Sequence, residues 1–321
     1  MRPILLIVGF QLLKVLDLFC GAGGLALGFK KAGFEVTGVD ISDCAGSTFE
    51  LNRAGKFIKA DLSRESIRER CEVVIGGPPC KPWSAVNTQK RGKNHGDYLL
   101  VARFLEHIER LAPKMFLMEN VPSLAGDPIL QTHIDKLSRQ GYSVTGQCVR
   151  YSDYGAPISR HRLVVVGAKD NDAQVFFRML HRYRKPASTV RAAIWDLRKT
   201  GKGDLPDHEW PELKTIGKYR DYYKTRKYGW YVLEWKKPAP SFGNVMKTYI
   251  LHPDAFDGGP TRVISVKEAS LIMGFSKKFR FPSGYGLGIR YQMVADSVSP
   301  VFSRVAARIV SQMLHGSRGH R

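Results

Sequence analysis

The stretch DLFCGAGGLALGF, residues 17–29, decides the fold. An apolar run, LLKVLDLF at residues 12–19, leads into a turn with three glycines within residues 21–24, and the pattern then predicts a helix that ends at Gly33. Such glycines let the backbone approach a ligand closely, and the helix N-terminus offers free N–H groups. Glycine turns between a strand and a helix are also common without a ligand, so other features must decide.

The same alternation of apolar runs and amphipathic stretches continues through the first half of the chain. Further strands are predicted at FEVTGVD (34–40), CEVVIGG (71–77) and KMFLMENV (114–121), with a polar, helix-like segment before the second and a helix at VARFLEHIERLA (101–112). YSVTGQCVR (142–150) and HRLVVVGA (161–168) predict a closing antiparallel pair, and VKEASLIMGF (266–275) and SPVFSRVAARIVSQML (299–314) predict later helices. This β-α-β order predicts an α/β protein with a parallel sheet and helices on both faces.

The charge of the chain indicates a polyanionic partner. Lys and Arg number 50 against 29 Asp and Glu, a formal net charge of +21. Nucleic acid is the first candidate, although a merely basic protein is the alternative. The five cysteines form no CxxC pair, so we expect no disulfide framework and no metal site, and a reducing cytosol fits.

The N-terminal residues look like a signal peptide at first sight. Polar residues at Gln11, Lys14 and Asp17 interrupt the apolar run, and no small-residue cleavage site follows. We therefore expect a strand at residues 12–19 after a short apolar extension at residues 1–10 without an assigned role. No apolar run is long enough for a membrane span.

Regular periodicity weakens after about residue 187 and is least regular in residues 198–237. That segment carries eleven Lys or Arg against six Asp or Glu. It also holds eight aromatic residues: Trp210, Tyr219, Tyr222, Tyr223, Tyr228, Trp230, Tyr231 and Trp235. A second, smaller domain is predicted here, with these side chains either contacting phosphates and bases or forming a small aromatic core beneath a basic surface.

Two acids follow strand-like runs and indicate a nucleoside cofactor. Asp40 ends FEVTGVD, and Asp61 holds the next such position, in KADL. An acid at a strand end can bind ribose hydroxyls, although a single one is more often a helix cap. No GxxxxGKS motif is present, so a dinucleotide and S-adenosylmethionine both remain open at this point.

Six motifs in order carry a resemblance to the cytosine-5 DNA methyltransferases. They are DLFCGAGG, GGPPCKPWS (76–84), FLMENVPSL (116–124), ISRHRLVVVG (158–167), RVISVKEASLIMGF (262–275) and YQMVADSVSP (291–300). The resemblance covers about residues 12–190 and 236–312 and implies a Rossmann-like methyltransferase sheet with helices on both faces, plus a smaller target-recognition domain. The expected division is a catalytic domain at 1–187, a target-recognition domain at 188–283 with a variable segment at about 198–235, and a C-terminal helix at 284–321.

The resemblance also implies a covalent mechanism. Cys80 matches the cysteine that attacks carbon 6 of a flipped-out cytosine, whereas a lone cysteine without this context is usually a small buried hydrophobe. Glu119 matches the glutamate that contacts N3 and the exocyclic amine. Arg162 is expected at the carbonyl oxygen of the base, and Arg160 on the phosphate or loop side.

S-adenosylmethionine is the cofactor that the resemblance implies. Its expected binding residues are Phe19, Gly21, Ala22, Gly23, Gly24, Asp40, Ile41, Asp61, Leu62, Pro78, Leu100, Asp296, Ser297 and Val298. The chain has Lys81 where the family usually has Gln, Trp83 where Phe is frequent, and Asp296 where Asn is usual. We expect Lys81 to favour the thiolate of Cys80. Asp296 is expected to weaken cofactor binding or, alternatively, to pair with a basic neighbour as a strut.

Together these features predict a DNA (cytosine-5)-methyltransferase that acts on a short duplex sequence. We expect a cytoplasmic, nucleoid-associated monomer on double-stranded DNA, not bound to a membrane, with a separately acting restriction endonuclease as a candidate partner. A tRNA methyltransferase of the same family is one alternative, although its Cys-Phe-Thr tripeptide is missing. An inactive DNA-binding homologue is another, although Cys80 and Glu119 are present. A dehydrogenase is disfavoured because GxGxxG is missing.

Overall fold

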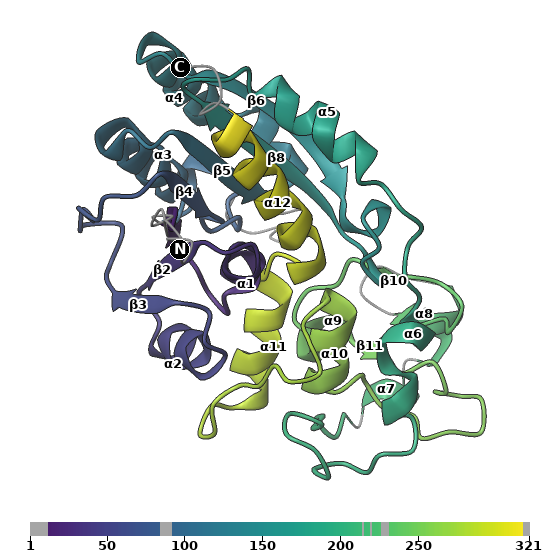
Figure 1. Ribbon diagram of the computed structural model, residues 1–321. Coiled ribbons are helices and arrows are strands. Elements are labelled where there is room, and N and C mark those ends of the chain that lie inside the picture. The colour runs from purple at the N-terminus through teal and green to yellow at the C-terminus, as the bar shows by residue number, and fades with distance from the viewer. Residues whose placement is uncertain (1–11, 84–91, 214, 219, 226–230, 317–321) are drawn as a thin grey trace, which may run out of the picture.

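A seven-stranded sheet forms the centre of the protein (Figure 1). The computed structural model describes residues 12–83, 92–213, 215–218, 220–225 and 231–316. The strands lie in the order β3 (Lys56–Lys59), β2 (Glu35–Asp40), β1 (Lys14–Leu18), β4 (Val73–Gly76), β5 (Met115–Asn120), β8 (His161–Ala168) and β6 (Ser143–Arg150). The first five are parallel, and β8 is antiparallel to both of its neighbours. The predicted α/β class and the closing antiparallel pair are confirmed.

Helices cover both faces of this sheet. α1 (Gly24–Lys31), α5 (Gln174–Arg182) and α12 (Pro300–Gly316) pack on one face, and α3 (Leu100–Leu111) and α4 (Pro128–Arg139) on the other, while α2 (Asp43–Leu51) follows β2 at the edge (Figure 1). α1 and α12 are in close contact, as a Cβ added to Gly28 of α1 would collide with Ser303 of α12. None of the helices in the described part of the chain is long and apolar enough to cross a membrane.

The polar stretch between β2 and β4 contains the predicted helix, which is α2, and then the edge strand β3. The residues from Asp61 to Glu72 that follow form a turn and extended backbone. Side chains of α3 take the place of helical hydrogen bonds: Arg103 donates to the carbonyl of Leu62 at 3.1 Å, and Arg110 donates to that of Ile67 at 2.8 Å. The backbone N–H of Ile67 donates to His107 at 3.3 Å. Contacts distant in the sequence therefore determine this conformation.

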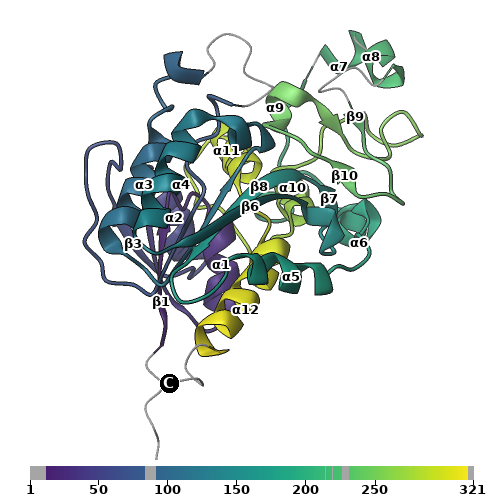
Figure 2. The same cartoon turned by 90° about the horizontal axis from the view of Figure 1, so that it is seen from above.

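Short elements gather beside one end of the sheet (Figures 1 and 2). They are α6 (Val190–Ile194), α7 (Thr215–Lys218), α8 (Arg220–Lys224), β9 (Tyr231–Val232), β10 (Ala239–Pro240), α9 (Val245–Thr248), β11 (Ile250–Leu251) and α10 (Val266–Met273). α10 is buried along its whole length and packs against α11 (Leu287–Asp296), which leads into α12. A buried ion pair fixes α10, since Arg262 binds both carboxylate oxygens of Glu268 at 2.7 and 2.9 Å.

The aromatic residues of the irregular segment are partly described. Tyr219, Tyr228 and Trp230 lie outside the described residues, as do residues 1–10. Three of the others pack inside: Arg262 lies over the ring of Trp210 at 4.2 Å, Tyr223 meets Phe256, and Trp235 donates to Asp254 at 2.9 Å. Tyr223 belongs to the hydrophobic core on this side of the protein, and Trp210 and Trp235 are half-buried against it.

Candidate active site

The turn after β4 carries the predicted nucleophile, Cys80. β4 and β5 are adjacent parallel strands, so their carboxyl ends meet at one edge of the sheet. Asn120, the last residue of β5, donates to the carbonyl of Pro78 at 2.9 Å, and the N–H of Trp83 donates to the carbonyl of Cys80 at 3.0 Å. The half-buried Cys80 is therefore held beside the end of β5, where Glu119 lies.

Glu119 is buried and held from two sides. Its Oε1 accepts from the hydroxyl of Tyr151 at 2.5 Å and forms an ion pair with Nε of Arg162 at 3.0 Å. Its Oε2 lies beside Gly77, 3.6 Å from where a Cβ on that glycine would be, and so faces the turn toward Cys80. Antiparallel pairing of β8 with β5 brings Arg162 to this point. Of the four predicted catalytic residues, Cys80, Glu119 and Arg162 therefore converge.

The electrostatic setting of Cys80 favours its neutral thiol in the free protein. Burial raises the pKa of the thiol above its ordinary value. The positive charges of Arg162 and Arg160 oppose that shift, while the negative charges of Glu119 and Asp296 add to it. The two arginines therefore favour the thiolate of Cys80, and the negative charges of Glu119 and Asp296 oppose it.

Arg160 faces the interior. Its guanidinium donates to the backbone carbonyls of Phe242 at 3.3 Å and Ala295 at 2.5 Å. Burial, followed by the charge of Arg162, lowers the pKa of Arg160 to about 10. These contacts join the sheet to the smaller elements and to α11, and the expected role of Arg160 on the phosphate or loop side stays a prediction.

An anchor of hydrogen bonds around Asp127, which was not predicted from the sequence, holds the Trp83 end of the turn after β4. Asp127 accepts from the indole of Trp83 at 2.7 Å and from the hydroxyl of Tyr98 at 2.6 Å. The hydroxyl of Ser123 donates to the carbonyl of Trp83 at 2.6 Å. Asp127 also caps α4 ahead of Pro128, and that Asp-Pro pair is the only signal in the sequence, one that indicates a helix cap rather than an active-site support.

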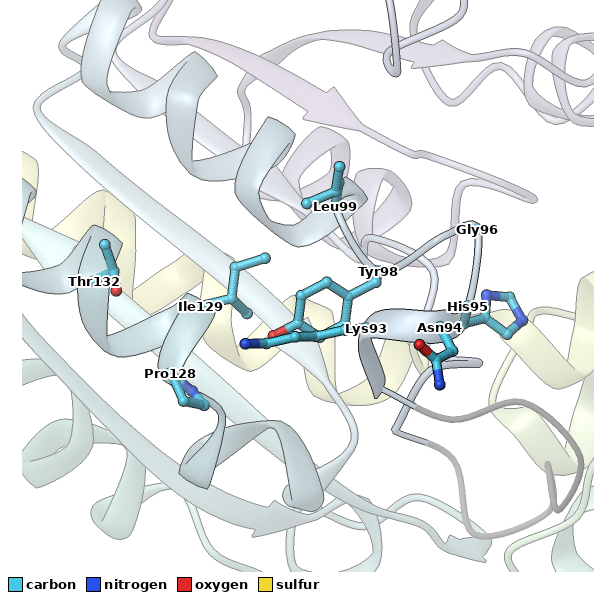
Figure 3. Close-up of a pocket in the computed structure, with 9 residues that line it drawn as sticks. All are labelled: Lys93, Asn94, His95, Gly96, Tyr98, Leu99, Pro128, Ile129 and Thr132. Atoms are coloured by element: carbon cyan, nitrogen blue, oxygen red, sulfur yellow. The ribbon is translucent and has the colours of Figure 1, made fainter.

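A surface hollow of about 670 Å³ lies beside this anchor (Figure 3). Its walls come from the segment 93–99 that precedes α3 and from the start of α4, and it is lined by Lys93, Asn94, His95, Gly96, Tyr98, Leu99, Pro128, Ile129 and Thr132. None of these residues is among the predicted site residues. The ammonium of Lys81 lies 3.7 Å from the carboxylate of Asp97, which lies in the sequence between two lining residues, Gly96 and Tyr98. Its expected effect on the thiolate stays a prediction.

The predicted cofactor residues gather at the same edge of the sheet, around the glycine turn. Asp40 accepts from the backbone N–H of Gly21 at 3.0 Å, which ties the ends of β1 and β2 together. A Cβ on Gly24 would collide with the carbonyl of Val298, so the start of α1 and the residues after α11 touch. Ile41 leaves 59% of its surface exposed here, an apolar surface that a ligand ring could cover.

Backbone and burial at this edge also fit a bound ligand. Phe19 is held at a φ of 59°, a region that non-glycine residues rarely adopt and that recurs at ligand sites. Asp17 is fully buried and burial raises its pKa, and its Oδ2 has no partner among the described residues. An unpaired buried polar atom beside a glycine turn with open space at Gly21 is compatible with a polar ligand.

The remaining predicted cofactor residues differ in burial and in their contacts. Asp61 accepts from the N–H and hydroxyl of Ser63 at 3.0 and 2.6 Å, a local cap. Ala22 and Leu62 are buried, Leu100 begins α3, and Gly23 and Ser297 lie beside the start of α1. Asp296 is exposed, and its carboxylate accepts from the side-chain amide of Gln292. This contact is with an amide, whereas the alternative interpretation of Asp296 as a strut required a basic residue. In the described ranges, no group of three His, Cys, Asp or Glu could hold a metal ion.

Comparison with known proteins shows the family of the chain. The sequence profile of the family described as C-5 cytosine-specific DNA methylase matches residues 13–314. The chain belongs to this family. It is therefore a DNA (cytosine-5) methyltransferase, and the resemblance and enzyme class expected from the motifs are confirmed.

Curated relatives and solved structures agree with the family. The type II methyltransferase M.FnuDI of Fusobacterium nucleatum is 29% identical over 94% of this chain and 95% of its own length. The type II methyltransferase M.HgiDI of Herpetosiphon aurantiacus is 30% identical, with 84% and 85% covered. The Entamoeba histolytica methyltransferase EhMeth has the same fold, with a TM-score of 0.70 at 17% identity over 94% of this chain and 99% of that one.

Proposed function

We propose that the protein methylates carbon 5 of a cytosine in duplex DNA through a covalent bond between Sγ of Cys80 and carbon 6 of that base. The observation that supports this most strongly is the convergence of Cys80, Glu119 and Arg162 at the ends of β4, β5 and β8. Carbon 5 of cytosine is a poor nucleophile. Addition of sulfur at carbon 6 moves the ring electrons toward N3 and leaves an electron-rich carbon 5.

The three side chains divide this work. Cys80 gives up its proton, and its sulfur bonds to carbon 6. The carboxyl of Glu119 shares a proton with N3, which neutralises the charge that the ring gains. Arg162, already paired with Glu119, supplies the positive charge closest to the reaction and offsets the burial of the thiolate. After transfer, the hydrogen on carbon 5 leaves as a proton and the bond between sulfur and carbon 6 breaks.

S-adenosylmethionine is the cofactor that fits the glycine turn. Asp40 and the exposed Ile41 would hold the ribose and adenine, and Gly21–Gly24 with Ser297 and Val298 would hold the methionine end. When bound, it supplies an electrophilic methyl group. The further proposed cofactor residues are Phe19, Asp61, Leu62, Pro78, Leu100 and Asp296.

Duplex DNA is the proposed substrate, with the target base turned out of the helix. The net charge of +21 suits such a polyanion, and a paired cytosine cannot reach a sulfur held in a half-buried turn. We propose that residues 198–235 within the smaller domain select a short sequence. The type II methyltransferase relatives suggest protection against a separately acting endonuclease.

A trapped adduct tests the covalent step. The protein is incubated with S-adenosylmethionine and duplex DNA that carries 5-fluorocytosine, whose fluorine prevents the final elimination. A denaturation-resistant adduct is expected with wild type and with Cys148→Ala, which changes an exposed cysteine on β6, and none is expected with Cys80→Ala. An equally stable adduct with Cys80→Ala would disprove the assignment.

A further inference from the structure

Tyr151 is an aromatic residue that makes direct contact with the proposed catalytic carboxyl. It lies in the short helix η3 (Tyr151–Asp153) and is completely buried, with its ring stacked on Phe302 at 5.1 Å between centroids. Burial, followed by the charge of Glu119, raises its pKa well above the ordinary value, so its hydroxyl keeps its proton. That hydroxyl donates to Oε1 of Glu119 at 2.5 Å.

The two oxygens of Glu119 are therefore not equivalent. Oε1 faces two protein donors, the Tyr151 hydroxyl and Nε of Arg162, whereas Oε2 faces Gly77 in the turn that leads to Cys80. Donors concentrated on one oxygen stabilise negative charge there, and they make the other oxygen the better site for a proton. A two-point hold also fixes the plane of the carboxyl, because turning it out of that plane would break both contacts.

We infer that Tyr151 is a positioning residue for Glu119, which fixes Oε1 in the protein and presents Oε2 as the oxygen that exchanges a proton with N3 of the target cytosine. When sulfur bonds to carbon 6, the O–H bond at Oε2 breaks as the N3–H bond forms, and the reverse occurs when sulfur leaves. This inference rests on the proposed function, since it assigns the oxygen that acts in it.

The hydroxyl of Tyr151 and Nε of Arg162 are the two groups that hold Oε1 of Glu119. Loss of the hydroxyl leaves the carboxyl held by Arg162 alone, so Oε2 is less firmly fixed in the position that faces the turn. Tyr151 is completely buried, so its loss should lower the rate of the chemical step and leave DNA binding unchanged.

The test compares Tyr151→Phe with Tyr154→Phe. Tyr154 is also buried and packs edge-on against the same Phe302 ring at 5.5 Å, but its hydroxyl is directed to Arg184. Single-turnover methylation is measured across a range of DNA concentrations. Tyr151→Phe should lower the limiting rate by about 10- to 100-fold, the effect of one hydrogen bond to a charged group, with the half-saturating DNA concentration unchanged. Tyr154→Phe should change neither quantity.

The same substitution made in the Glu119→Ala variant keeps the test decisive if Tyr151→Phe is less stable than wild type. In Glu119→Ala, the same substitution should leave the residual rate unchanged, because its partner is gone. An unchanged limiting rate for Tyr151→Phe, an equal loss for Tyr154→Phe, or a further loss of rate when Tyr151→Phe is added to Glu119→Ala would overturn the inference. Wild-type protein that traps no 5-fluorocytosine would overturn the proposed function itself. An adduct with wild type together with an unchanged limiting rate for Tyr151→Phe would overturn only the role of Tyr151.

Discussion

Replacing Glu268 by Gln is expected to destabilise the protein by about 3–5 kcal/mol, the range for removing one partner of a buried ion pair. The carboxylate of Glu268 is completely buried and accepts from Arg262 at 2.7 and 2.9 Å and from the N–H of Ser265 at 2.7 Å. A glutamine amide would turn an N–H toward one of these donors. The charge of Arg262, with only 7% of its surface exposed, would then remain buried without a counter-charge.

The effect has a defined pH dependence. Burial opposes the charge of Glu268, but the hydrogen bonds and charge of Arg262, with help from His252, hold the pKa of its carboxyl below the ordinary value. A carboxyl with a lowered folded-state pKa stabilises the protein above its unfolded pKa, about 4.3 for Glu. The stability gap between wild type and Glu268→Gln should therefore be complete near pH 7. The gap should shrink as the pH falls below about 4.3, the unfolded-state pKa of Glu.

Urea denaturation followed by circular dichroism measures the gap, with Glu69→Gln as the matched control. Glu69 pairs with Lys56 at 3.4 Å, and both side chains are exposed, so the control should change stability by less than about 1 kcal/mol. A loss for Glu268→Gln no larger than that of the control, or a gap that does not change between pH 7 and pH 3, would refute the reasoning.

Three further predictions concern the active site. Arg162→Met should raise the pH at which Cys80 is alkylated more than Lys81→Gln does, because Arg162 is the cation that most lowers the pKa of the thiol; equal shifts measured by iodoacetamide kinetics would contradict this. Gly24→Ala should weaken S-adenosylmethionine binding by at least about 10-fold in calorimetric titration, because its new methyl group meets backbone that cannot move freely. Grafting residues 198–235 into a related methyltransferase should transfer target specificity, and an active chimera that keeps its host's target would disprove that role.

Buried strands were predictable because continuous apolar runs indicate strands covered on both faces. This holds for β1, β2, β4 and β5, which lie in or beside the centre of the sheet. β3 was missed, because KFIK is a short edge strand whose four residues stay partly exposed. The helix expected between β2 and β4 is present as α2, whereas the extended backbone just before β4 gave no signal, because its hydrogen-bond partners belong to α3, later in the chain.

The site residues that lie in the sequence motifs were predictable, and those that only the fold brings to the site were not. Cys80, Glu119 and Arg162 were named from their motifs, and the register of β4, β5 and β8 brings them together. Tyr151 and Asp127 gave no such signal, because an isolated tyrosine predicts core packing and an acid before proline predicts a helix cap. Their contacts join residues 32 and 44 positions apart, a relation that local patterns do not contain.

Direct analysis of the methylated product tests the central claim most sharply. DNA from cells that express wild type or Cys80→Ala is sequenced for 5-methylcytosine, with Cys148→Ala as the control for loss of a cysteine. We expect 5-methylcytosine at one short duplex sequence with wild type and with Cys148→Ala, and none with Cys80→Ala. Methylation at the same sites by Cys80→Ala, or no 5-methylcytosine with folded wild type, would contradict it.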